Sequence, residues 1–175
     1  LDTMMSIKSF LDASVKNVIK TLIEAILLVL IVVYVFLQSV RSTFIPLVGI
    51  VVSLVGTFAF LYVAGFSINL LTLFALVLVI GTVVDDSIVE LENIQRHLNT
   101  GARRWDAILE AAREVAMPIF ASTVTTVVVF LPMFFIVGIT RLLLIPLTVT
   151  IAIALFTSFF ISRTVTPALC YKFLK

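Results

Sequence analysis

Charge is scarce in this sequence, and its scarcity excludes an ordinary soluble domain. Only 13% of the 175 residues are Asp, Glu, Lys or Arg, and 62% are hydrophobic, whereas soluble domains carry about 25% charged residues. Four stretches contain no charge at all, residues 25–40, 42–84, 115–140 and 142–162. Because about 20 apolar helical residues cross a hydrocarbon core of about 30 Å, the sequence predicts a protein that spans a membrane.

Cysteine is almost absent as well. The single Cys170 excludes a disulfide framework within the chain, and its place after an apolar stretch predicts a buried, unreactive thiol. The sequence also lacks an initiating Met, a basic leader region and a signal cleavage site. We therefore expect it to be a fragment of a larger membrane protein.

The apolar stretches predict an all-α membrane protein with five spans. The stretch 42–84 is roughly twice as long as one crossing needs, and GFSIN, residues 65–69, supplies glycine and polar groups for a turn within it. Helices are expected because open strands would leave backbone groups unpaired in lipid. The predicted spans are residues 18–37, 44–64, 70–91, 118–137 and 142–164.

The distribution of basic residues predicts the orientation of these spans. If the spans alternate in direction, eight of the 12 Lys and Arg residues fall on one side, which the positive-inside rule assigns to the cytoplasm. Those eight are Arg41, Arg96, Arg103, Arg104, Arg113, Arg163, Lys172 and Lys175, and the other four are Lys8, Lys16, Lys20 and Arg141. Since these residues act as topology determinants, the net charge of +2 gives no indication of nucleic-acid binding.

Four segments follow from this orientation. Residues 1–17 are an extracytoplasmic lead-in, 18–91 hold three spans, 92–117 are a cytoplasmic linker, and 118–175 hold two spans and a cytoplasmic end. In the linker, RRWDAILEAAREVA places apolar residues at helical spacing, namely Trp105, Ile108, Leu109, Ala112 and Val115. We expect a separate amphipathic helix that lies along the interface as a connector, with anionic lipid or a partner as its alternative ligand.

Prolines and small residues carry predictions about packing. Three prolines are expected in first helical turns, Pro46, Pro118 and Pro146. Pro132 lies inside its predicted span and should kink it. In the second span, three small residues should let another helix approach closely: Gly49, Ser53 and Gly56.

Asp85 and Asp86 interrupt the third span, within GTVVDDSIVELEN, residues 81–93. One Asp at a helix centre costs about 2.5 to 3.5 kcal/mol on insertion scales, so the pair must face protein or water. Burial and a like-charged neighbour both favour protonation, and the two groups then titrate as a coupled pair. The pair is a candidate proton-relay site; the alternative is an interhelical salt bridge of fixed charge.

A proton relay of this kind needs a cation that the carboxylates can exchange. Every Lys and Arg is predicted near a span end, so we expect the cation to come from outside these 175 residues. Glu24, the other acid within a span, lies one turn from Lys20. Glu24 is predicted to lie at the membrane interface, or to support Asp85 and Asp86 without carrying the proton itself. No cofactor or metal site is predicted.

The motif VDDSIVELEN, residues 84–93, with GFSIN before it, resembles the resistance-nodulation-division (RND) efflux pumps. Within that family it is similar to the hydrophobe/amphiphile branch, the acriflavine-resistance type of multidrug transporter. Residues 18–96 resemble the second to fourth transmembrane helices of that branch, and RTVTPALC, residues 163–170, resembles the end of its sixth. By this resemblance, the chain covers helices two to six of the first transmembrane repeat.

The resemblance implies a proton-driven antiporter that exports hydrophobic or amphiphilic compounds, a secondary active transporter and no enzyme. Asp85 and Asp86 match the proton-relay aspartates of the family, whose Lys or Arg counter-ion comes from the second transmembrane repeat of the same polypeptide. The family context further implies a homotrimer in the lipid bilayer of a bacterial inner membrane. There it works with a periplasmic adaptor and an outer-membrane channel.

Other functions stay open at this point. Heavy-metal RND pumps typically carry Asp-Gly where this chain has Asp85-Asp86, and a further acid where Val79 stands, which disfavours metal export. A protein-translocation auxiliary of the superfamily, or a membrane scaffold with a fixed buried salt bridge, would share the helices without exporting drugs. Intramembrane aspartyl proteases draw their two aspartates from different helices, an arrangement that adjacent acids do not readily reproduce.

Overall fold

The computed structural model describes residues 2–101 and 103–174, and within these ranges the side chains from Asp12 onward. The described residues form five α-helices and no strand: α1 (Asp2–Leu37), α2 (Val40–Val63), α3 (Leu70–Leu98), α4 (Arg104–Phe130) and α5 (Ile139–Phe173). A 3-10 helix, η1 (Leu131–Phe135), follows α4. The predicted all-α fold with five membrane-length helices is confirmed. The predictions for the Lys8 and Lys175 side chains lie outside the described residues.

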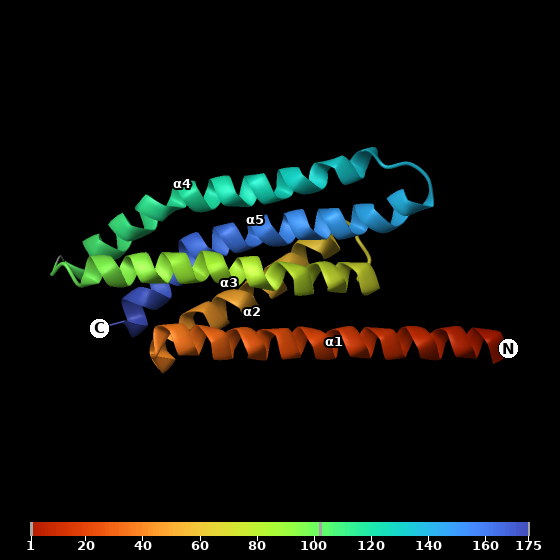
Figure 1. Ribbon diagram of the computed structural model, residues 1–175, viewed down its shortest axis with the longest axis horizontal. Helices are drawn as coiled ribbons and strands as arrows, with labels where there is room; N and C mark the ends of the chain where they lie inside the picture. The colour runs from red at the N-terminus through yellow and green to blue at the C-terminus, as the bar shows by residue number, and fades with distance from the viewer. Residues whose placement is uncertain (1, 102, 175) are drawn as a thin grey trace.

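Successive helices run in opposite directions along the long axis of the bundle (Figure 1). The α1–α2 connection, the α3–α4 turn and the C-terminus meet at one end, and the N-terminus, the α2–α3 turn and the α4–α5 connection lie toward the other. Helix α3 is central because it packs against each of the other four helices, whereas α1 and α4 lie on opposite sides and do not touch. This position surrounds much of α3 with protein.

The predicted turn at GFSIN is confirmed, and its residues show why the chain reverses there. Gly65 adopts a positive φ of 74°, which a residue with a Cβ rarely adopts. Asn69 then caps α3, since its Oδ1 accepts a hydrogen bond from the Thr72 N–H at 2.9 Å while Thr72 Oγ1 accepts one from the Asn69 N–H at 2.9 Å. The reciprocal pair satisfies two otherwise unpaired donors and sets the start of α3.

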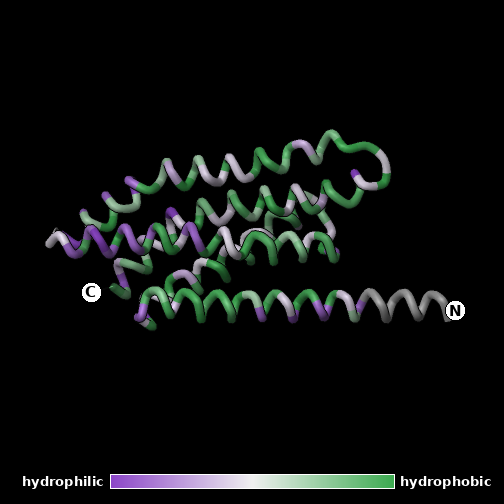
Figure 2. Tube along the Cα trace, viewed as in Figure 1, coloured by the Kyte–Doolittle hydropathy of each residue, from purple (hydrophilic) through white to green (hydrophobic). Residues whose placement is uncertain are grey.

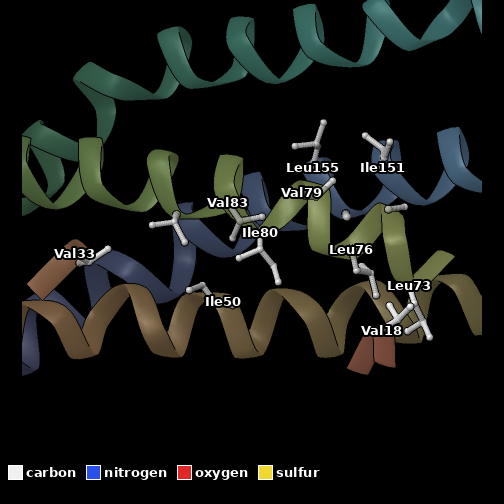
Figure 3. Close-up of a cluster of buried hydrophobic side chains, with 13 residues drawn as sticks. Val18, Val33, Ile50, Leu73, Leu76, Val79, Ile80, Val83, Ile151 and Leu155 are labelled. Atoms are coloured by element: carbon white, nitrogen blue, oxygen red, sulfur yellow. The ribbon is translucent and has the colours of Figure 1, made fainter. Parts of the chain in front are cut away.

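Two apolar clusters hold the bundle. The larger one joins α1, α2, α3 and α5 along the membrane-length part of the helices, and Figure 3 shows several members, including Val33, Ile50, Ile80 and Leu155. The smaller one lies toward the end that bears the α3–α4 turn and consists of Ile45, Leu91, Ile94, Ile108, Ala111 and Cys170. Cys170 is fully buried, as predicted.

Close helix approach is confirmed for the second span. A Cβ added at Gly56 would lie 2.8 Å from Thr157 Cγ2 on α5, and one added at Gly49 would lie 3.5 Å from Ser87 Oγ on α3. Ser53 is buried on the same helix. These small side chains therefore let the α2 backbone approach both α3 and α5.

The predicted first-turn prolines are wrong, because the helices begin earlier than the apolar stretches do. Pro46, Pro118 and Pro146 lie inside α2, α4 and α5. Pro132 does not kink a continuing helix; α4 ends at Phe130 and the chain tightens into η1 with Pro132 in its first positions. Pro132 has no N–H to donate to the carbonyl four residues earlier, which is compatible with the change from α-helix to 3-10 helix at this point.

The linker helix is present, but it is not a separate connector. Residues 104–117 form the first half of α4 and continue into the fourth span without a break, and a turn at residues 99–101 separates them from α3. Ala107, Ile108 and Ala111 are buried where α4 packs against α3 and α5, whereas Trp105 is exposed. Small and apolar residues at helical spacing thus fasten this segment to the bundle. Residues 2–17 likewise continue into the first span as part of α1.

Candidate functional site

Asp85 and Asp86 lie near the middle of α3. Asp86 is at the edge of the buried face of this helix, and Asp85 is outside that face. Asp85 is exposed on this five-helix unit, Asp86 is half-buried, and Val84 and Ser87 beside them are buried. Successive helical residues point about 100° apart. Asp86 therefore borders the packed interior, while Asp85 points away from the other helices of this chain.

Neither aspartate forms an ion pair within 4.0 Å in the part of the chain that the structure describes. The described ion pairs with N–O distances within 4.0 Å involve other acids: Lys20–Glu24, Arg96–Glu114, His97–Glu114 and Arg163–Glu90. Among the same residues, no three His, Cys, Asp or Glu side chains come together as a metal site would require.

Glu90 is the acid that sequence reasoning missed. It lies one helical turn after Asp86 on α3, and its exposed fraction is 0%. Its Oε2 lies 3.6 Å from Nη2 of Arg163 on α5, a side chain only 15% exposed. Helix α5 continues past the predicted end of the fifth span to Phe173, so Arg163 lies within this helix, where it faces Glu90.

Arg163 joins three helices at this point. Besides facing Glu90 on α3, its Nη1 donates a hydrogen bond to the backbone carbonyl of Ala112 on α4. The signal for this cluster was present as the i, i+4 spacing of Asp86 and Glu90, which places both acids on one helical face. The predicted third span ends at residue 91, which puts Glu90 in its last turn, where an acid needs no special partner.

Below Glu90, a polar network ties α3 to α4. Asn93 donates to the Ala111 carbonyl at 2.9 Å and to Glu114 Oε2 at 3.0 Å. Arg96 donates to both oxygens of Glu114, at 3.1 and 3.0 Å. Together with Asp86 and Glu90, Asn93 forms a stripe of polar residues that runs along α3 toward the α3–α4 turn.

Glu24 lies apart from this stripe. Its side chain is 62% exposed on α1, and its described partner is Lys20, with 3.6 Å between Nζ and Oε1. An exposed i, i+4 ion pair contributes at most a few tenths of a kcal/mol. A supporting role for Glu24 in proton transfer stays a prediction.

Comparison with known proteins identifies relatives over nearly the whole chain. The model of the AcrB/AcrD/AcrF family matches residues 2–175. The chain is 45% identical over 163 residues to multidrug resistance protein MdtC of Escherichia coli O9:H4 (strain HS), and 46% identical over 163 residues to the protein of that name from Enterobacter sp. (strain 638). Each match covers 93% of this chain and 16% of the relative. This chain therefore spans about one sixth of the length of the curated relatives it matches.

Proposed function

This chain belongs to the AcrB/AcrD/AcrF family, and from that membership we propose that it carries the proton-coupling helices of a proton-driven multidrug exporter. It is a multi-pass membrane protein of an RND efflux family whose named relatives are multidrug resistance proteins. Family membership supports a transporter and not an enzyme. The proposed cargo is a range of hydrophobic or amphiphilic compounds, moved in exchange for protons.

The observation that carries the proposal is the position of Asp85 and Asp86 near the middle of α3, a central apolar helix long enough to span a membrane. Two carboxyls near the middle of a central apolar helix cost several kcal/mol unless protein or water faces them. Asp85 points away from the other helices of this chain, so we propose that further helices of a longer polypeptide cover it and supply a Lys or Arg counter-ion. The coverage of 16% of the relatives is compatible with such a polypeptide.

The proposed cycle uses the charge of this pair as a switch. A proton from the extracytoplasmic side neutralises an aspartate, the counter-ion is released, and α3 moves relative to its partner helices. Release of the proton to the cytoplasm restores the charge and the first arrangement. A difference of a few kcal/mol between two arrangements is enough to move such an equilibrium, and one buried charge can supply it.

The assembly and location follow the family resemblance. We propose a homotrimer in a bacterial inner membrane that works with a periplasmic adaptor and an outer-membrane channel. The basic residues at the end with the α3–α4 turn support a cytoplasmic position for that end. A scaffold with a fixed buried salt bridge is the second candidate, because Arg163 Nη2 lies 3.6 Å from Oε2 of the buried Glu90.

Exchange of either aspartate for Asn tests the proposal. Asp85→Asn and Asp86→Asn keep the size of the side chain but remove the titratable carboxyl, so we expect drug or dye efflux to be lost. Accumulation is measured in bacteria that lack their main efflux pumps and express the full-length polypeptide that contains this chain. Asp106→Asn, the same exchange at an exposed residue of α4, is the control and should export normally.

The contrary result is also clear. If both Asn variants are inserted and expressed like the wild type and still export, the aspartates are a packing feature. The scaffold candidate then replaces the transport proposal for this part of the chain.

A further inference from the structure

Glu90 is a buried carboxyl that receives no hydrogen bond from the described residues. Its exposed fraction is 0%, and neither Oε1 nor Oε2 has a hydrogen-bond partner among them. A permanently ionised carboxylate in a protein interior normally accepts several hydrogen bonds, because desolvation otherwise penalises the charge strongly. The surroundings of Glu90 therefore suit a group that gains and loses a proton better than one that stays ionised.

Arg163 faces Glu90 without engaging it fully. The distance of 3.6 Å between Nη2 and Oε2 exceeds the roughly 2.7 to 2.9 Å of a charge-assisted hydrogen bond. Meanwhile Nη1 is bonded to the Ala112 carbonyl of α4, and Nε and Nη2 donate no hydrogen bond to any described group. The guanidinium is thus held between a backbone acceptor on α4 and the carboxyl on α3.

Other groups that face Glu90 are few. Asp86 lies one turn away on α3, where i, i+4 side chains have their Cβ atoms about 5 to 6 Å apart. From α5, Arg163 approaches it, and the Cys170 thiol is buried in the cluster that contains Leu91, the residue after Glu90. Helix α4 contributes the Ala112 carbonyl through Arg163, while its acids are exposed; the described ionisable side chains of α1 and α2 are exposed as well. Asp86 and Arg163 are therefore the groups whose charge acts on Glu90 most directly.

We propose that Glu90 is a third proton-carrying carboxyl of this chain, which exchanges protons with Asp86, and that Arg163 is its switchable counter-ion. The inference rests on the proposed function. In the transfer, the O–H bond of Asp86 breaks and an O–H bond forms on Glu90, so that Asp86 becomes anionic and Glu90 neutral. With Glu90 neutral, Arg163 stays on the Ala112 carbonyl; with Glu90 ionised, Arg163 moves to it. A change in protonation on α3 thereby changes the contacts that Arg163 of α5 makes with α3 and α4.

Labelling with dicyclohexylcarbodiimide tests whether Glu90 is ever protonated. This apolar reagent adds to protonated carboxyls within membranes, and peptide mass spectrometry locates the adduct. The full-length polypeptide in membrane vesicles should carry an adduct on Glu90 that decreases as the pH rises and is lost in Glu90→Gln. Absence of a Glu90 adduct at every pH at which the protein stays folded would overturn the inference, because it indicates a permanent ion pair.

Paired substitutions separate proton carriage from packing. Glu90→Gln leaves Arg163 buried without its counter-ion, so loss of efflux in this variant alone could come from damage to the fold. The double variant Glu90→Gln/Arg163→Gln removes both charges. If the pair is only structural, the double variant should regain both thermal stability and the wild-type pH dependence of efflux, which overturns the inference. If Glu90 carries protons, stability returns but the pH dependence stays altered.

The control and the link to the proposed function are separate measurements. Glu110→Gln, the same exchange at an exposed glutamate of α4, should leave the pH dependence unchanged. Failure of the proposed function appears as normal efflux in Asp85→Asn and Asp86→Asn. Failure of this inference alone appears as loss of efflux in those two variants together with a wild-type pH dependence in the Glu90→Gln/Arg163→Gln variant.

Discussion

Some polar residues of α3 face the other helices of this chain, and others point away from them. Asp86, Glu90 and Asn93 follow one another along the face that packs against α4 and α5, whereas Asp85 is turned away from it. One helix thus presents a carboxyl to each of two environments. This division gives the two aspartates different neighbours even though they are adjacent in sequence.

Asn93 is the residue on this face whose contribution to stability is most readily measured. It is buried and donates to both the Ala111 carbonyl and Glu114. We expect Asn93→Ala to lower the free energy of unfolding by about 1 to 3 kcal/mol, because it removes two hydrogen bonds at a buried position. Thermal unfolding of the purified full-length protein measures the change.

Asn99→Ala, at an exposed position in the α3–α4 turn, is the matched control for Asn93→Ala and should change the midpoint of unfolding much less. Equal midpoints for the two variants would show that the Asn93 bonds do not hold α3 to α4.

At the scale of helices, α2 approaches α5 closely at Gly56. A Cβ at this position would lie 2.8 Å from Thr157 Cγ2, so Gly56→Ala should force the two helices apart. We expect destabilisation of about 1 to 3 kcal/mol, the usual cost of overpacking. Thr157→Ser removes the obstructing methyl group, and the double variant should therefore recover much of the lost thermal stability. Additive effects of the two substitutions would contradict this packing.

The helices could be predicted from sequence far better than their ends or their contacts. Long charge-free stretches and the GFSIN turn were enough to predict five spans, because lipid requires each span to be a long apolar helix. The same criterion places span ends where charged residues become frequent. It therefore puts Glu90 in the last turn of the third span, and it separates residues 104–117 from the fourth span although α4 is continuous there.

The Glu90–Arg163 contact could not be predicted because it joins residues that are far apart in the chain. Each charge alone is unfavourable in an apolar bundle, and their compatibility depends on how α3 and α5 pack. Periodicity within one helix contains no information about that packing. The Asp85-Asp86 pair, in contrast, stands out within a single apolar stretch.

The whole molecule has unlike ends and a mostly apolar outer surface. Figure 2 shows hydrophilic residues gathered at the end with the α3–α4 turn, while the long middle parts of the helices are mainly hydrophobic. Exposed apolar side chains such as Leu28, Ile31 and Val35 on α1 suit contact with lipid hydrocarbon or with further helices. A bundle of this kind has one stable orientation, which its basic residues should select.

Thiol labelling tests that orientation. Thr100 lies in the α3–α4 turn and Ser67 in the α2–α3 turn, at opposite ends of the bundle, and both are exposed. In full-length protein without other exposed cysteines, a membrane-impermeant maleimide added to intact cells that have a permeable outer membrane should label Ser67→Cys. It should label Thr100→Cys only after the inner membrane is opened. The reverse pattern would place the basic end outside the cytoplasm, and the proposed entry of protons from the extracytoplasmic side would then run from the opposite end of α3.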